Sequence, residues 1–475
     1  MKILFTAFEC APFFKTGGLG DVAGALPKEL AKKGLETIVV LPYFTKMASK
    51  YQEQCEDVLS FSVNVGWRKQ YCGIKKLKDE NVTYYFIDNL YYFDREQLYG
   101  YDDDGERFAF FQQAVIEMME KIAFIPDVMH INDYHTAMIP FLLKEKYHWI
   151  EAFQSIRTLL TIHNIEFQGK YGADILPDLF GVGKERFDDG TARWDGALNF
   201  LKTGILYANH VNTVSPSYAQ EIMTPAFGNG LETVLQMERQ KLSGILNGID
   251  YDQNNPATDP ALIAPYSAEN SAGKQANKQE LQRIMGLPQE AHTPIIAVVS
   301  RLTYQKGFHL VLEELENLLQ FDVQFVLLGT GDPRFEAAFS HIAQKYPHKC
   351  AVDINFDVQL AQKIYAGSDL FLMPSAFEPC GLSQMIAMRY GTLPIVHEIG
   401  GLKDTVQPFN PITGTGNGFG FVEFTGFHLM QTIKQGLVLY EQSPETWNTI
   451  QQNAMNHDFS WTTACQAYIH LYHQL

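Results

Sequence analysis

The chain has 475 residues, of which 46% are hydrophobic and 19% charged, a composition typical of folded globular proteins that excludes a disordered or fibrous chain. This length predicts two large domains or three smaller ones. The formal net charge of −17 argues against attraction to nucleic acid or to an anionic membrane, so we expect neither as a partner, and an anionic ligand would need local positive charge.

Apolar, β-branched runs alternate with segments of helical period in the first half of the chain. The predicted strands are 2–8, 36–41, 82–88, 127–131, 158–164 and 210–215. A helix is predicted after the first strand, because apolar residues share one face at helical spacing: Leu19, Val22, Ala23, Leu26 and Leu30. The second half repeats the pattern, with strands at 294–300, 323–329, 369–375 and 393–398 and a helix at 308–319. Short buried strands alternating with helices predict an α/β fold with parallel, doubly wound sheets.

Between the halves, residues 247–278 are rich in Asn, Pro, Ala and Ser and have little periodicity, so we predict the hinge there. Two Rossmann-like domains facing a deep cleft are expected, with ligands bound at the carboxyl ends of the strands. The six cysteines are scattered without a C-x-x-C pair, so neither a disulfide framework nor a zinc site is predicted. There is no signal-peptide pattern and no apolar run of membrane-spanning length, so a cytoplasmic location is expected.

The glycine-rich stretch FFKTGGLGDV, residues 13–22, follows the first strand after a long loop. Gly18, Gly20 and Ala23 fit the dinucleotide fingerprint G-x-G-x-x-G/A. A dinucleotide-binding turn follows its strand at once, however, and no acidic residue ends the next apolar run. A long loop with Lys15 beside two glycines is suited to reach over a ligand, and a flexible surface turn is the alternative.

Two cations follow the predicted strand 294–300, where the chain reads RLTYQKG. Arg301 and Lys306 lie in a loop at the carboxyl end of a buried strand and could neutralise a diphosphate. The alternative is that they are ordinary solvated loop charges.

A carboxylate and a helix start follow the predicted strand 369–375. Glu378 precedes Pro379, a favoured first helical residue, and the next three residues, Cys380, Gly381 and Leu382, would present backbone amides to an anion. These groups together suit a ligand with both hydroxyls and phosphates. The alternative is that Glu378 caps the helix, worth roughly 0.3–1 kcal/mol, and for this stretch alone that alternative ranks first.

Six separated motifs identify a resemblance: KTGGLGDV, TIHN, NGID, SRLTYQKG, FEPCGLSQM and YGTLPIV followed by GGLKDTV. In this order, and over nearly the whole chain, they resemble the bacterial glycogen synthase and plant starch synthase family. The resemblance implies a two-domain GT-B fold and transfer of glucose to the non-reducing end of an α-1,4-glucan (glycogen or a malto-oligosaccharide) with retention of configuration. It favours ADP-glucose as donor and leaves UDP-glucose open. We expect an acceptor-side domain at 1–243, a donor domain at 244–455, and a C-terminal helix at 456–475 packing back on the first domain.

The resemblance also implies residue roles. The implied donor contacts are Lys15, Gly18, Asn247, Arg301, Lys306, Phe356, Cys380, Gly381 and Leu382, the acceptor contacts are Asp21, Asp133 and Asn164, and the catalytic residues are Glu378, His163, Lys15, Arg301 and Lys306. Phe356 would stack on the nucleobase, with core burial as the alternative. His163 would meet the transferring glucose, with a satisfied buried histidine as the alternative.

Two departures from the family pattern matter. The chain reads NDYH, with Asn132 before Asp133, where His-Asp-Trp is common, which bears on acceptor contacts near Asp133. Related transferases of the same fold carry a second Glu eight positions after the first, and here that residue is Ile386, which argues against a sucrose or trehalose type of transferase.

The motifs supply no convincing pair of carboxylates about 5 Å apart, as a covalent retaining mechanism requires. We therefore expect front-face displacement, in which the cations stabilise the departing diphosphate and its oxygen takes the acceptor proton. No ligand cluster suggests a metal, and no cofactor is expected. A catalytically inactive carbohydrate-binding relative and a nucleotide-dependent oxidoreductase remain alternative classes.

Overall fold

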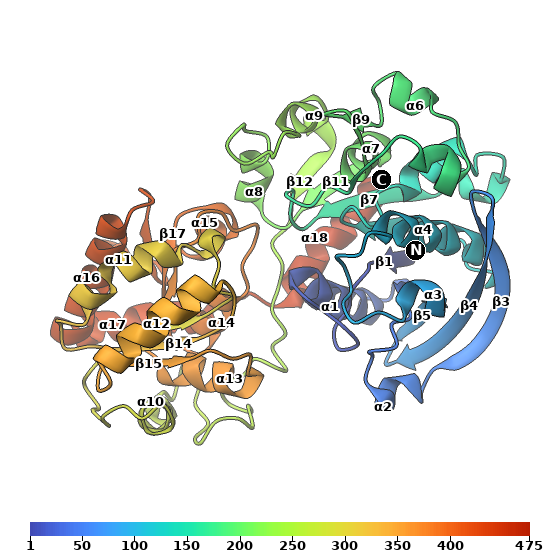
Figure 1. The fold of residues 1–475 in the computed structure, drawn as a ribbon. Coiled ribbons are helices and arrows are strands. Elements are labelled where there is room, and N and C mark those ends of the chain that lie inside the picture. The colour runs from blue at the N-terminus through green and yellow to red at the C-terminus, as the bar shows by residue number, and fades with distance from the viewer. The chain divides into compact units, whose positions relative to one another are not determined.

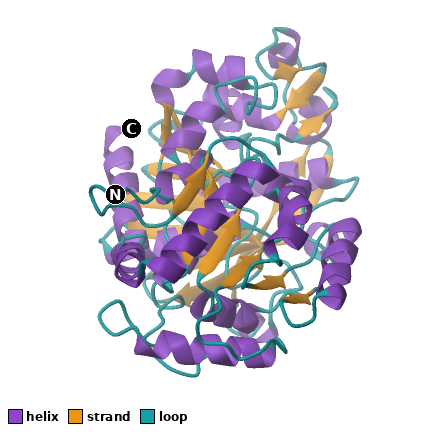
Figure 2. Cartoon of the chain, turned by 90° about the vertical axis from the view of Figure 1, so that its left-hand side faces the viewer, coloured by secondary structure: helices purple, strands orange, loops and turns teal.

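The computed structural model describes residues 1–475, which form two compact units. The first unit contains residues 1–247 and 461–475, and the second contains 248–460 (Figure 1). Strands and helices both run through the chain, as the orange arrows and purple coils of Figure 2 show. No helix is both long enough and apolar enough to cross a bilayer.

The first unit is built on a nine-stranded sheet in the order β12-β11-β7-β6-β1-β2-β5-β4-β3. Its strands are β1 (Lys2–Thr6), β2 (Glu36–Pro42), β3 (Glu56–Val65), β4 (Arg68–Asp79), β5 (Val82–Asp88), β6 (Val128–Asn132), β7 (Arg157–Ile162), β11 (His210–Thr213) and β12 (Leu242–Gly244). In this order, the first seven strands, which end with β5, are parallel. The next strand, β4, pairs antiparallel with both β5 and β3. The sequence-based prediction of a purely parallel sheet was therefore wrong at this edge.

Helices and a small antiparallel sheet complete the first unit. The helices are α1 (Gly18–Lys32), α2 (Ser49–Gln52), α3 (Leu90–Phe93), α4 (Asp104–Lys121), α5 (Ile139–Glu145), α6 (Glu185–Asp188), α7 (Phe200–Tyr207), α8 (Pro216–Glu221), α9 (Glu232–Met237) and α18 (Trp461–Gln474), with the short helical turns η1 (Glu151–Phe153), η2 (Leu176–Phe180) and η3 (Arg239–Lys241). The small sheet contains β8 (Lys170–Tyr171), β9 (Arg193–Trp194) and β10 (Ala197–Asn199).

Strand β1 shows how the large sheet forms two cores. Successive side chains of a strand point to opposite faces, so Ile3 and Phe5 join the core that contains α1 and α18, whereas Leu4 joins the core that contains α4. The C-terminal helix α18 lies beside α1 in Figure 1, and its Tyr472 hydroxyl is 2.7 Å from Nδ1 of His130 on β6. The last helix of the chain is thus an integral part of the first unit.

The second unit has a six-stranded, wholly parallel sheet in the order β15-β14-β13-β16-β17-β18. Its strands are β13 (Ile295–Val299), β14 (Gln324–Leu328), β15 (Cys350–Asp353), β16 (Leu370–Met373), β17 (Leu393–His397) and β18 (Phe419–Phe421). Its helices are α10 (Ala272–Ile284), η4 (Tyr304–Lys306), α11 (Phe308–Leu318), α12 (Pro333–Lys345), α13 (Val358–Gly367), α14 (Ser383–Arg389), α15 (Gly400–Thr405), α16 (Gly426–Gln442) and α17 (Pro444–Asn456). The prediction of a doubly wound α/β architecture is confirmed.

The divisions between units lie a few residues beyond the expected ones. Ile245 still bonds to Thr213 of the first sheet, so the first crossing comes after Asn247 rather than after residue 243. The return crossing comes after Ser460, because the segment after α17 pairs with the start of the second unit: Ile249 donates to the carbonyl of Phe459 at 2.8 Å. The predicted linker 247–278 was too long, since α10 begins at residue 272.

Both large sheets reverse their strand order at one point. In the first unit the order diverges between β1 and β6, and in the second between β13 and β16. Loops that leave the carboxyl ends of two such strands run in opposite directions and leave room for a ligand between them. The predicted site residues Lys15, Asp133, Arg301 and Glu378 all follow these strands.

Candidate active site

The loop after β1 carries Lys15 of the first unit. Its Nζ lies 2.6 Å from Oδ1 of Asp21, in the first turn of α1, and the two side chains are 45% and 34% exposed. Our prediction assigned Lys15 to the donor and Asp21 to the acceptor. The structure joins them in one ion pair whose ammonium still reaches solvent, so Lys15 remains available to a ligand.

Glycines open the start of α1 and let the loop approach it. A Cβ added to Gly17 or Gly18 would meet nothing within 4 Å, so the side of the backbone where a side chain would stand is open at both positions. A Cβ on Gly20 would lie 2.4 Å from Cβ of Lys15, so only glycine allows the loop to pass this close. A backbone hydrogen bond also attaches the loop to the start of α1, because the amide of Ala11 donates to the carbonyl of Gly20 at 2.9 Å.

Glu9 is a residue that the sequence analysis missed. It is 5% exposed, and its Oε2 accepts hydrogen bonds from the backbone amides of Thr16 at 2.5 Å and Gly17 at 3.1 Å. The Thr16 hydroxyl also lies 3.2 Å from each carboxylate oxygen, and the hydroxyl of Tyr99 donates to Oε1 at 3.0 Å. An acidic residue directly after the first strand was the available signal, but its partners could not be read from the sequence.

Asp133 follows β6 with a positive φ of 56°. Its Oδ1 accepts the amide hydrogen of His163 at 2.7 Å, which links the ends of β6 and β7. Burial raises the pKa of Asp133 to about 7, and the nearby charge of Glu9 acts in the same direction, while the amides of His163 and Asn164 oppose the rise. A carboxyl group with this pKa can change its charge near neutral pH.

His163 follows β7, and its Nε2 lies 2.9 Å from Oδ1 of Asn132. Asn132 donates from Nδ2 to the carbonyl of Thr6 at 3.0 Å, so its Oδ1 is the atom that faces the histidine. Burial lowers the pKa of His163 to about 3, so the imidazole is neutral, with its hydrogen on Nε2 and an acceptor lone pair on Nδ1. His163 is therefore a buried, satisfied histidine that also stands at the carboxyl end of a central strand.

Two asparagines complete the predicted residues of the first unit. Asn164 is half-buried and accepts from the amide of Glu166 at 3.0 Å, which fixes the turn after β7. Asn247 is 5% exposed, and its Oδ1 has no hydrogen-bond partner. A buried amide oxygen without a partner is costly, so this atom is a fitting contact for a ligand hydroxyl.

In the second unit, Arg301 follows β13, is exposed and forms no ion pair, whereas Lys306 ends the short helix η4. Gly307 comes next, with φ of 75°, and a Cβ there would lie 1.9 Å from the carbonyl oxygen of Pro374. Only glycine allows this contact between the loops after β13 and β16. Ala376 also donates to the carbonyl of Gln305 at 2.8 Å, so the two loops form one assembly.

Glu378 lies in this assembly and pairs with Lys306. The Lys306 Nζ is 2.5 Å from Oε2 of Glu378, and the Ser375 hydroxyl donates to the same oxygen at 3.0 Å. The Glu378 side chain is 7% exposed and that of Lys306 17%. Both contacts are on Oε2, and no side chain caps the next helix, so the alternative that Glu378 only caps that helix is wrong.

The next helix also begins later than predicted. α14 starts at Ser383, with Leu382 as its N-cap and no side-chain cap, so Pro379 is not its first residue. Gly381 has φ of 75°, which an α-helix cannot include. Residues 380–382 form a turn beside α15, where a Cβ on Gly401 would lie 2.1 Å from the carbonyl oxygen of Cys380. Of the predicted amides, those of Cys380 and Gly381 belong to this turn, whereas that of Leu382 lies at the N-cap of α14.

Phe356 lies in the loop between β15 and α13 and is 80% exposed. Its amide donates to Oδ1 of its neighbour Asn355 at 2.8 Å. The alternative of core burial is therefore wrong. An exposed aromatic ring at the carboxyl end of a parallel strand is available for stacking on a flat ligand.

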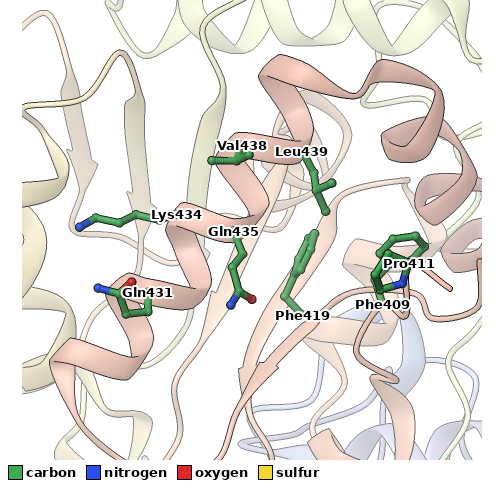
Figure 3. A pocket seen from close by; sticks show the side chains of 8 residues that line it. All are labelled: Phe409, Pro411, Phe419, Gln431, Lys434, Gln435, Val438 and Leu439. Carbon is green, nitrogen blue, oxygen red and sulfur yellow. The ribbon is translucent and has the colours of Figure 1, made fainter.

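A separate pocket of about 440 Å³ lies between α16 and residues 409–419, which lead into β18 (Figure 3). It is lined by Phe409, Pro411, Phe419, Gln431, Lys434, Gln435, Val438 and Leu439. Figure 3 shows the Phe419 ring between Phe409 and α16. None of the predicted site residues lines this largely apolar pocket, so we do not assign the donor to it.

Two family models match the chain. A model described as the starch synthase catalytic domain matches residues 2–237, and one described as glycosyl transferases group 1 matches residues 282–434. A sucrose-phosphate synthase from Thermosynechococcus elongatus has a similar structure, with TM-score 0.62 and 16% identity over 100% of this chain and 98% of its own. At this identity the likeness supports the GT-B fold alone.

Other relatives are much more similar. A glycogen synthase from Ligilactobacillus salivarius is 63% identical and one from Streptococcus agalactiae is 60% identical, each over the full length of both chains. The catalytic domain of starch synthase IV from Arabidopsis thaliana, solved with ADP and acarbose, has TM-score 0.92 and 34% identity over 99% of this chain and 98% of its own. The chain therefore belongs to the glycogen synthase and starch synthase family of GT-B glucosyltransferases.

Proposed function

We propose that this protein transfers glucose from ADP-glucose to the non-reducing end of an α-1,4-glucan, glycogen or a malto-oligosaccharide, with retention of the α configuration. The observation that carries the proposal is the pairing of Lys306 with the buried Glu378 at the β13/β16 switch point, with Arg301 on the same loop as Lys306. It combines two cations for a diphosphate with a carboxylate for sugar hydroxyls. A cytoplasmic location fits the presence of this donor.

In this proposal the second unit binds the donor. Arg301, which has no competing ion pair, and Lys306, which stays beside Glu378, neutralise the diphosphate. The exposed ring of Phe356 stacks on the nucleobase, and the turn at 380–382 offers amides to hydroxyl and phosphate oxygens. Glu378 accepts hydrogen bonds from glucose hydroxyls and stabilises the positive charge that develops at the anomeric carbon.

The first unit supplies the contacts to the acceptor and further contacts to the diphosphate. Lys15 and the amide of Gly18 bind the diphosphate at the start of α1, where the helix dipole favours an anion. Nδ1 of the neutral His163 accepts a hydrogen bond from the transferring glucose, and Asn247 binds the donor through its unpartnered oxygen. Asp21, Asp133 and Asn164 contact the glucan.

The chemistry follows from this arrangement. Glu378 is held by Lys306 and Ser375, which suits an electrostatic role better than attack on the sugar. The leaving diphosphate oxygen takes the proton of the incoming glucan hydroxyl, which attacks from the same face, so the configuration is kept. The three cations, Lys15, Arg301 and Lys306, lower the barrier by stabilising the charge on the departing diphosphate.

The test uses the purified chain, a malto-oligosaccharide, and ADP-glucose and UDP-glucose in competition. We expect release of ADP to exceed release of UDP, an α-linked product by NMR, and activity that survives EDTA. Faster use of UDP-glucose would overturn the donor assignment, and a β-linked product would overturn retention. Binding of glucan and donor without turnover would instead support a catalytically inactive carbohydrate-binding relative.

A further inference from the structure

Glu9 occupies an unusual place under the loop that carries Lys15. Its buried carboxylate collects two backbone amides, the Thr16 hydroxyl and the Tyr99 hydroxyl at distances of 2.5 to 3.2 Å. The two amides belong to Thr16 and Gly17, the residues directly after Lys15. Gly17 is the N-cap of α1 and has no side chain with which to cap the helix itself.

The contacts of Glu9 fix the direction of Lys15. The loop is tied at its base, where Cys10 and Phe14 exchange backbone hydrogen bonds of 2.9 and 3.0 Å. Beyond Lys15, the only charged group that anchors the Thr16–Gly17 backbone is Glu9. Lys15 itself stands between these anchors, pressed against Gly20. Without the second anchor, the 45% exposed Lys15 side chain would be carried on a free backbone.

We propose that Glu9 is a positioning residue for glucosyl transfer: its carboxylate holds the Thr16–Gly17 backbone so that Lys15 and the Gly18 amide are aligned on the donor diphosphate before it binds. This inference rests on the proposed donor role of Lys15. A carboxylate near a diphosphate would repel it if exposed, but here the carboxylate is buried and its oxygens accept hydrogen bonds from the loop and from Tyr99. Prealigned positive charge of this kind stabilises the negative charge that grows on the diphosphate as it leaves the glucose.

The first test does not depend on activity. Glu9→Gln keeps the shape but leaves one neutral carbonyl oxygen in place of two charged oxygens, so the bonds to the Thr16 and Gly17 amides weaken and we expect faster hydrogen exchange in a peptide covering residues 13–20. The matched control is Glu117→Gln, which alters another carboxylate of the first unit that also accepts from a tyrosine hydroxyl, that of Tyr147 at 2.7 Å. Unchanged exchange in Glu9→Gln, or equal change in both variants, would overturn the anchoring role.

The second test is kinetic. Glu9→Gln should lower kcat/KM for ADP-glucose about 10- to 100-fold, because a misplacement of about 1 Å can cost 10²-fold, while Glu117→Gln stays near wild type. In a Lys15→Ala background the effect of Glu9→Gln should shrink to less than about threefold, since Lys15 carries most of the effect of Glu9 and only the contact of the Gly18 amide remains to be disturbed. Equal effects in the two backgrounds would show that Glu9 does not act through Lys15.

A conservative variant keeps the proposal testable if Glu9→Gln does not fold. Thr16→Val, at an exposed position, removes only the hydroxyl contacts to Glu9. It should raise hydrogen exchange in residues 13–20 and lower kcat/KM, each by less than Glu9→Gln does. No change in either would overturn the proposal. If the wild-type chain transfers no glucose, the proposed function fails, whereas the exchange result still decides whether Glu9 anchors the loop.

Discussion

Three cations carry the proposed diphosphate contacts, and their environments differ. Lys15 shares an exposed pair with Asp21, Arg301 is exposed and unpaired, and Lys306 pairs with the buried Glu378. Removing a surface charge changes stability little, whereas removing Lys306 leaves a buried carboxylate without its counter-ion. The three positions therefore separate effects on catalysis from effects on folding.

Replacing Lys15, Arg301 or Lys306 by Ala should each lower kcat/KM by 10²- to 10³-fold, or roughly 2–4 kcal/mol of transition-state stabilisation. Only Lys306→Ala should also lower the melting temperature, through a loss of about 1–3 kcal/mol of stability. Steady-state kinetics and calorimetry measure both. Arg334→Ala, at a side chain that is 89% exposed, is the control and should change neither. Near-normal kcat/KM in any two of the three variants would contradict the diphosphate assignment.

Glu378→Gln tests the proposed contact with glucose. The amide keeps the size of the side chain but not the charge that stabilises the anomeric carbon, so kcat should fall steeply while the donor Kd changes much less. The melting temperature should fall slightly, because Lys306 loses its partner. Kinetics, donor titration and melting on one preparation distinguish the outcomes. An unchanged kcat with a lower melting temperature would return Glu378 to a structural role.

The raised pKa of Asp133 predicts that the stability of the protein depends on pH. Its pKa in the folded protein, about 7, is above the ordinary value of 3.8, so the folded state holds the proton more tightly. The resulting stabilisation is complete below the ordinary pKa and is lost as the pH rises through the folded pKa. Between about pH 4 and about pH 7, Asp133 should therefore cost the protein roughly 2–4 kcal/mol of stability.

Asp133→Asn removes this titration. Asparagine tolerates the positive φ and can still accept from the His163 amide, so the fold should persist. Its melting temperature relative to wild type should rise from about pH 5 to about pH 8, as measured by thermal unfolding in matched buffers. A difference that does not change with pH would mean that Asp133 titrates as an ordinary carboxylate.

At the scale of elements, buried central strands were predictable and half-exposed edges were not. β1, β2, β13 and β14 are near-continuous apolar runs, because both of their faces are covered by helices. β3 is largely exposed, so its sequence lacks such a run, and its antiparallel pairing with β4 was missed. The start of α14 was misplaced, because Pro379 suggested a helix while Gly381 adopts a left-handed conformation.

The same limit applies to the site. The sequence alone placed each loop after its strand, and so it placed Lys15, Arg301 and Glu378, which lie on these loops. The partners could not be placed: Lys306 and Glu378 are 72 residues apart in the chain, and Tyr99 and Glu9 are 90 apart. Each such pair depends on the meeting of two loops that are far apart in the chain. Local spacing carries no signal for that meeting.

Gly307 shows how one backbone position joins two loops. Gly307→Ala adds a Cβ that would lie 1.9 Å from the carbonyl oxygen of Pro374, so the loops after β13 and β16 must separate. We expect a marked fall in both melting temperature and kcat/KM. Gly286→Ala is the matched control: φ is 69° and its Cβ meets nothing within 4 Å, so it should cost only about 1–2 kcal/mol of strain and leave kinetics unchanged. Equal effects of the two substitutions would show that the loop contact is unimportant.

At the scale of the whole molecule, the chain begins and ends in the same unit. The second unit is inserted between β12 and α18, so its two connections occur side by side at Ile249 and Ser460, which form a β-bridge. Tyr251 reinforces this pairing, because its hydroxyl donates to the carbonyl of His457 at 3.1 Å and accepts from the amide of Phe459 at 2.9 Å. The completion of the first unit thus depends on chain that is synthesised last.

Truncation after Ser460 tests this dependence. It removes six buried side chains of α18 from the core around α1, of which four are large: Trp461, Tyr468, Leu471 and Tyr472. Burial of each contributes about 1.5–3 kcal/mol, and His130 would also lose the hydroxyl of Tyr472. Because the loss approaches the whole stability of a typical domain, the first unit should melt far earlier or not fold, while the second unit keeps its own transition.

Calorimetry with hydrogen exchange on peptides from each unit would measure the two transitions separately. A chain that ends at His473 is the control, since it lacks only the last two residues, which lie outside the buried set, and it should behave as wild type. Loss of both transitions in the 1–460 chain would show that the units are stabilised together. Wild-type melting of the first unit would show that α18 is dispensable, and that its buried aromatic contacts contribute far less than their burial predicts.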